Sequence, residues 1–154
     1  MRMRNIFFIL FVVLASVVEA QTVNMGDVDY PESSPADCNV FGTAGQNFAD
    51  PGGEAANYPA NYNGTMVFCP DLTTGTKMSI QFGINAGSVF DIDGSDSIYV
   101  YDGPSTASPL LGVHNSVTDP NGFTYQASWN NPSGCLTVVF ISDGANEGAG
   151  WFGN

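Results

Sequence analysis

Two stretches in the second half of the chain decide the fold: Asp96-Ser-Ile-Tyr-Val-Tyr-Asp-Gly103 and Ser133-Gly-Cys-Leu-Thr-Val-Val-Phe-Ile-Ser-Asp143. Each is rich in β-branched and aromatic residues and ends in turn-forming residues, a pattern that predicts a β-strand. Each strand also has aspartates at its ends. Because strand ends can present carboxylates together, these aspartates are candidate oxygen ligands for a hard cation such as calcium.

The same pattern of short apolar runs between turn residues extends from Cys38 to the end of the chain. Clusters of Gly, Pro, Asn, Asp and Ser separate the runs at spacings typical of an all-β sandwich. No segment after the N-terminus repeats its apolar residues with the period of a helix, so we expect almost no helix. The predicted strands are residues 65–68, 77–82, 88–92, 97–101, 110–113, 123–127 and 136–141.

The N-terminus has the organisation of a secretory signal peptide. Arg2 and Arg4 precede the apolar run Ile6 to Val18, and Val18-Glu-Ala20 matches a cleavage site. The apolar run is shorter than the roughly 20 residues that span a bilayer, which disfavours a membrane anchor. We therefore expect residues 1–20 to be removed on secretion, with no membrane insertion afterwards. Residues 21–37 are acidic and poor in apolar side chains, which predicts a flexible leader or linker.

The charge of the mature chain is strongly negative. Cleavage after Ala20 leaves Lys77 as the one basic side chain against fourteen acids, a net charge of −13. Such a surface repels nucleic acid and anionic lipid, and it favours cations or basic protein patches. Solubility alone accounts for many of these acids.

The sequence offers no catalytic constellation. His114 is the single histidine, and it has no Ser or Cys placed beside it as a nucleophile. There is no phosphate-binding loop, no zinc-protease helix and no Cys-x-x-Cys pair. We therefore expect a non-enzymatic chain. Trp129 lies in a polar loop, which makes it the best exposed candidate for contact with a ligand.

Several motifs in register resemble the CUB domain in its secreted bacterial form, and they cover nearly all of residues 38–154. In the first half they are Cys38, Phe48-Ala-Asp-Pro-Gly-Gly53, Asn57-Tyr-Pro-Ala-Asn-Tyr62 and Phe68-Cys-Pro70. In the second half they are Asp96 to Gly103, Ser108-Pro-Leu-Leu-Gly112, Ser133 to Thr137, Phe140-Ile-Ser-Asp143 and Gly150-Trp151. The resemblance implies a jelly-roll-like antiparallel β-sandwich that binds proteins or glycans outside the cell.

The resemblance also implies a calcium site. Asp96 and Asp143 match two of the family's ligands, and Asp93 matches the third, with Asp91 as the alternative. Three converging carboxylates repel one another, and a divalent cation relieves that repulsion. Read without the resemblance, the same residues are better explained as ordinary turn aspartates, which are common in loops.

The three cysteines leave at least one sulfur without a partner in this chain. The resemblance implies a disulfide between Cys38 and Cys69, and a partner for Cys135 beyond residue 154. The family's sandwich also continues past the Gly-Trp motif, so the resemblance implies a domain truncated at its C-terminus with an incomplete last strand.

The sequence and its resemblance to the CUB family together predict a secreted, non-enzymatic CUB-type module that binds an extracellular protein with a basic patch, in a calcium-dependent manner. One alternative is a jelly-roll carbohydrate-binding module in which Trp129 contacts a glycan. Another is an accessory fragment of a larger secreted peptidase or adhesin.

Overall fold

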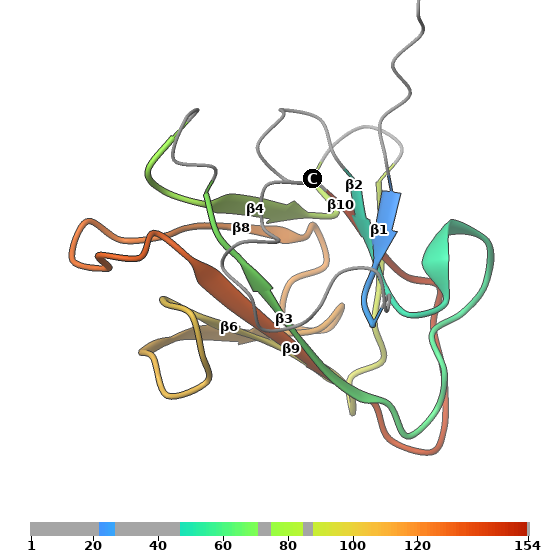
Figure 1. The fold of residues 1–154 in the computed structure, drawn as a ribbon. Helices are drawn as coiled ribbons and strands as arrows, with labels where there is room; N and C mark the ends of the chain where they lie inside the picture. The colour runs from blue at the N-terminus through green and yellow to red at the C-terminus, as the bar shows by residue number, and fades with distance from the viewer. Residues whose placement is uncertain (1–21, 27–46, 71–74, 85–87, 154) are drawn as a thin grey trace, which may run out of the picture.

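The computed structural model describes residues 22–26, 47–70, 75–84 and 88–153, which form two packed β-sheets (Figure 1). The first sheet has the order β1-β2-β10-β4-β8, and β5 also pairs with β10. The second has the order β3-β9-β6-β7. The strands are β1 (Thr22–Asn24), β2 (Asn47–Ala49), β3 (Asn63–Phe68), β4 (Ser79–Phe82), β5 (Val89–Asp91), β6 (Ser97–Tyr101), β7 (Leu110–His114), β8 (Phe123–Gln126), β9 (Leu136–Ile141) and β10 (Gly150–Gly153).

The predicted antiparallel β-sandwich is confirmed. All strand pairs are antiparallel except β1 with β2, and β6 and β9 are the two central strands of the second sheet. Within the described ranges the only helical element is a 3-10 turn, η2 (Gly53–Ala55), and no helix there is long and apolar enough to cross a membrane.

The alternation of residues along β6 shows why these sequences form a sandwich. Ile98 and Val100 are buried, whereas Ser97, Tyr99 and Tyr101 point to the other face and are partly exposed. One face of each strand therefore packs on the core, as a half-buried strand requires. The core contains aromatic residues from both sheets, among them Phe140, Phe48 and Trp151, with ring centroids of Trp151 at 4.9 Å from Phe140 and 5.5 Å from Phe48.

The N-terminal part of the sandwich differs from the prediction. Residues 21–37 are predicted to be a linker, but β1 lies within them, pairs with β2, and buries Val23 and Met25 in the core. The linker prediction is therefore wrong for residues 22–26, because two apolar residues spaced by two suffice to fill one edge of the sheet. Residues 27–37 and the predicted signal peptide, residues 1–20, lie outside the described residues.

A buried carboxylate joins β2 to β10. Asp50 accepts hydrogen bonds from the N–H groups of Gly52 at 2.6 Å and Trp151 at 3.2 Å. Burial raises the pKa of Asp50 from 3.8 to about 6, although these backbone hydrogen bonds act in the opposite direction. In the sheet β10 has partners on both sides, β2 on one and β4 and β5 on the other.

Candidate functional site

A buried tyrosine–aspartate pair organises one end of the sandwich. The Tyr58 hydroxyl donates to Asp96 Oδ2 at 2.6 Å and accepts from the Asp93 N–H at 3.1 Å. The other carboxylate oxygen, Asp96 Oδ1, accepts from the Asp143 N–H at 2.8 Å. One carboxylate and one phenol therefore tie together three segments that are far apart in the sequence. We call the cluster of Asp93, Asp96 and Asp143 the acidic edge.

The register of the second sheet explains why these segments meet. Ser97 in β6 lies opposite Ile141 in β9, so Asp96, one residue before β6, lies beside the residues that follow β9. Asn115, just after β7, donates to the carbonyl oxygens of Asp96 at 3.3 Å and Gly94 at 3.2 Å. These bonds fix the turn between β5 and β6, so the position of Asp96 is determined by the sheet itself.

Two pKa shifts follow from this arrangement. Burial, together with the hydrogen bond to Asp96, raises the pKa of Tyr58 to about 12, so the phenol keeps its proton and remains a donor. The pKa of Asp93 is lowered by hydrogen bonds from the Ser95 N–H at 3.0 Å and the Ser95 hydroxyl at 2.7 Å. Asp93 is therefore a charged carboxylate on the acidic edge.

The structure brings the predicted metal ligands into one neighbourhood without forming a cage. Asp93 accepts from Ser95, and Asp143 accepts from the Ala145 N–H at 2.9 Å, so each carboxylate is bound to its own turn. Asp91 accepts from the Ala149 N–H at 3.0 Å, on the loop before β10. Among the residues that the structure describes, no three His, Cys, Asp or Glu side chains are grouped to hold a metal ion.

The donor set nevertheless has the chemistry that calcium takes, since it consists of carboxylate oxygens from two adjoining segments, the β5–β6 turn and the residues after β9. Asp93 is half-buried and Asp143 is exposed, and the carboxylate of each accepts a hydrogen bond within its own turn. The metal role of these residues stays a prediction.

The predicted disulfide is wrong. Cys69 is bonded to Cys135, with Cα atoms 4.1 Å apart, so Cys69 has no sulfur to offer Cys38, and Cys135 is not unpaired. The reason is the register of the antiparallel strands β3 and β9. Phe68 lies opposite Leu136, so Cys69, the next residue along the chain, lies opposite Cys135, which precedes Leu136. Cys38 lies outside the described residues.

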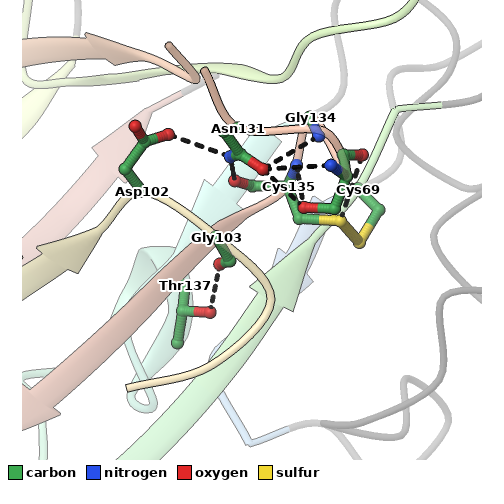
Figure 2. Close-up of a disulfide and its surroundings, with 8 residues drawn as sticks. Cys69, Asp102, Gly103, Asn131, Gly134, Cys135 and Thr137 are labelled. Atoms are coloured by element: carbon green, nitrogen blue, oxygen red, sulfur yellow. Dashed lines mark hydrogen bonds between the residues drawn. A yellow bond between two sulfur atoms is a disulfide. The ribbon is translucent and has the colours of Figure 1, made fainter. Parts of the chain in front are cut away.

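The disulfide belongs to a second hydrogen-bonded cluster, at the other end of β6 and β9 (Figure 2). Asn131 lies between Asp102 and the disulfide, and its amide nitrogen donates to Asp102 Oδ1 at 2.9 Å and to the Cys135 carbonyl at 2.7 Å. Thr137 donates to the Gly103 carbonyl at 2.7 Å. Trp129, predicted to be exposed, is 90% exposed in the loop between β8 and β9.

His114 is a structural residue. Its Nδ1 lies 2.7 Å from Asp119 and its Nε2 lies 3.0 Å from the Tyr125 hydroxyl, while the ring stacks on Phe123 with centroids 3.8 Å apart. Both nitrogens are therefore engaged.

Sequence reasoning missed the role of Tyr58. The residue stands in the motif Asn57-Tyr-Pro that carries part of the family resemblance, yet nothing in that motif indicates a distant carboxylate partner. A signal does exist in hindsight. An aspartate that directly precedes a buried strand, as Asp96 does, enters the protein interior and requires a donor.

Comparison with known proteins finds similarity to solved structures alone. No protein-family model matches the chain, and no curated protein matches it either. Among solved structures, the chain is similar to the CUB1-EGF-CUB2 domain of human MASP-1/3, with 21% identity, a TM-score of 0.44, and coverage of 63% of this chain and 33% of that one. It is also similar to the MASP-1 CUB2 domain bound to Ca²⁺, with 16% identity, a TM-score of 0.43, and coverage of 70% of this chain and 87% of that one.

Both structures contain CUB domains. The β-sandwich of this chain is established by its own strand pairing. It spans about a third of the length of the first structure. The calcium is a property of the second structure, and the likeness assigns no ligand to this chain.

Proposed function

We propose that this chain is a secreted, non-enzymatic module that binds an extracellular protein through the acidic edge, with calcium ordering that edge. The observation that carries the proposal is the Tyr58–Asp96 pair. It fixes the backbones of Asp93 and Asp143 beside a buried carboxylate and leaves their own carboxylates at the surface. The same hydrogen bonds thus fix the backbone segments that carry these carboxylates.

The charge distribution supports a cationic ligand. Lys77 is the one Lys or Arg in the described part of the chain, and its ammonium group donates to the Asn131 carbonyl, at the opposite end of the sandwich. The acidic edge therefore has no basic side chain of the described residues to compensate it. A calcium ion, a basic side chain of a partner, or both together supply the missing positive charge.

The environment of His114 supports a non-enzymatic role. A general base needs a free nitrogen within reach of a substrate proton. In this chain both ring nitrogens already contact Asp119 and Tyr125, and the ring is packed on Phe123.

Thermal unfolding of the full secreted chain in calcium and in EDTA tests the proposal. If calcium binds only the folded state with a dissociation constant on the order of 1 mM, as in extracellular modules, 10 mM calcium adds about 1.4 kcal/mol of stability. That corresponds to a rise in Tm of a few degrees. Asp143→Ala should abolish the rise.

Two matched variants identify the third ligand. Asp93→Asn should reduce the rise, whereas Asp91→Asn should leave it intact, because Asp91 is bound to the loop before β10. An unchanged melting curve of the unmodified chain on addition of calcium would contradict the calcium-dependent function.

A further inference from the structure

The most exposed large apolar side chain among the described residues is Trp129, which is 90% exposed. Tryptophan is normally largely buried, because its ring offers a large apolar area to water. The second tryptophan, Trp151, follows this rule and is 1% exposed. An indole presented to solvent at a loop tip is the feature expected of a binding anchor.

The loop that carries Trp129 is fixed on both sides of the indole. The Ser128 N–H donates to Asp102 Oδ1 at 3.0 Å, and the Asn131 N–H donates to the Ser128 carbonyl at 3.2 Å. Asn131 Oδ1 accepts from Ser133 and Gly134, directly before the Cys69–Cys135 disulfide (Figure 2). Binding at this loop therefore requires little ordering of the backbone, which favours affinity.

A cleft lies beside the loop. Its volume is about 340 Å³, and its walls come from the turn between β6 and β7 and from the loop between β8 and β9. The two residues that flank Trp129 in the sequence, Ser128 and Asn130, both line it. Trp129 itself is not among the lining residues, so its backbone adjoins the cleft while its indole is exposed to solvent.

The lining of the cleft combines apolar and uncharged polar groups. Pro104, Pro109 and Pro132 supply apolar surface, while Ser108, Ser128, Asn130 and Ser133 supply hydroxyl and amide groups. The one charged lining residue is Asp102. Its burial opposes ionisation, but hydrogen bonds from Ser128 and Asn131 and the nearby charge of Lys77 outweigh that effect and lower its pKa. The charges of Asp102 and Lys77 thus offset each other.

We propose that the Trp129 loop and this cleft form a binding site for a neutral saccharide. A sugar ring has an apolar face of C–H groups and a rim of hydroxyls, so it matches an exposed indole next to prolines and to serine and asparagine side chains. A protein partner fits less well, because an aromatic anchor of a protein interface lies within a ring of other packed residues. Trp129 has polar neighbours on both sides in the sequence.

This site is separate from the acidic edge and goes beyond the proposed function. Asp96 precedes β6 and Asp102 follows it, so the two sites lie at opposite ends of the same strand, about 20 Å apart at 3.3 Å per residue. Saccharide binding should therefore persist in EDTA and in Asp143→Ala, whether or not calcium binds at the acidic edge.

The test uses the full chain and soluble neutral oligosaccharides, namely hexamers of β-linked glucose, N-acetylglucosamine and mannose, with calorimetry as the readout. We expect at least one hexamer to bind, and Trp129→Ala to weaken its binding roughly tenfold or more, as the loss of a stacked ring does. The ligand should also protect the exposed indole from collisional quenching of its fluorescence. Val117→Ala is the matched control, because Val117 is 76% exposed and is not part of the cleft.

The melting temperature of Trp129→Ala should equal that of the unmodified chain, since the indole makes no ring contact with the described core. Failure of all three hexamers to bind would overturn the proposal. So would equal binding by Trp129→Ala and the unmodified chain, or binding that EDTA abolishes. If no saccharide bound, and if a purified protein partner bound the unmodified chain but not Trp129→Ala, the site would be a protein-binding site instead.

Discussion

Replacing Tyr58 with phenylalanine tests how the acidic edge is built. The change removes one oxygen atom and leaves the ring, which packs on Phe140 with centroids 5.0 Å apart. Without the hydroxyl, Asp96 Oδ2 loses its donor and the Asp93 N–H loses its acceptor. Because Asp96 is 1% exposed, water does not replace the lost donor easily. A hydrogen bond to a buried charged group contributes about 1.5–3 kcal/mol, so we expect Tyr58→Phe to destabilise the chain by about 2–3 kcal/mol.

The assay is equilibrium unfolding in urea, with thermal unfolding as a second measure. A loss of this size lowers the Tm of a chain of this length by about 10 °C. Tyr99→Phe is the control, because Tyr99 points to the outer face of β6 and is partly exposed. Its effect should stay within about 0.5 kcal/mol. Equal stability of Tyr58→Phe and Tyr99→Phe would refute the reasoning, because it would mean that the bond to Asp96 does not hold the three segments together.

Three further predictions concern other parts of the molecule. Peptide mapping without reduction should recover Cys69 linked to Cys135, and recovery of Cys69 linked to Cys38 would contradict the fold at this edge. Reduction of the disulfide should lower the free energy of unfolding by about 4 kcal/mol, the chain-entropy value for a separation of 66 residues. The raised pKa of Asp50 means that its contribution to stability is full below about pH 4 and is lost as the pH rises through about 6, a change of up to roughly 3 kcal/mol. Asp50→Asn should remove this component of the pH dependence measured by urea unfolding, and an unaltered profile would show that Asp50 does not titrate in that range. Gly150→Ala should destabilise the chain by more than about 2 kcal/mol in the same assay, because Gly150 has a φ of +75° and a Cβ there would lie 2.1 Å from Asp50 Oδ2; a stability equal to that of the unmodified chain would mean that β10 does not approach Asp50 this closely.

The sequence predicts the strands well where the alternation of residues is strong. Residues 97–101 and 136–141 are strands with the predicted bounds, because their buried and exposed positions alternate or run continuously between clear turns. The short strands β1 and β2 are missed, since three residues are too few to show a period. Their place in the sheet depends on pairing with β10, which comes from the far end of the chain.

The candidate site, too, can be predicted from the sequence only in part. The aspartates at strand ends can be chosen from the sequence, because the strand fixes their place along its length. Their partners cannot, because Tyr58 reaches Asp96 across 38 positions, and because the pairing of Cys69 depends on which strand lies next to β3. Contacts of this kind are decided by the sheet order, which local patterns do not contain.

The most direct test of the central claim is a crystal structure of the full chain grown in calcium. The account predicts one calcium ion at the acidic edge, with carboxylate oxygens of Asp93, Asp96 and Asp143 at about 2.3–2.6 Å, and with the Tyr58–Asp96 hydrogen bond retained. The account would be contradicted by crystals in which this edge is free of metal, with Asp93 still bound to Ser95 and Asp143 still bound to Ala145.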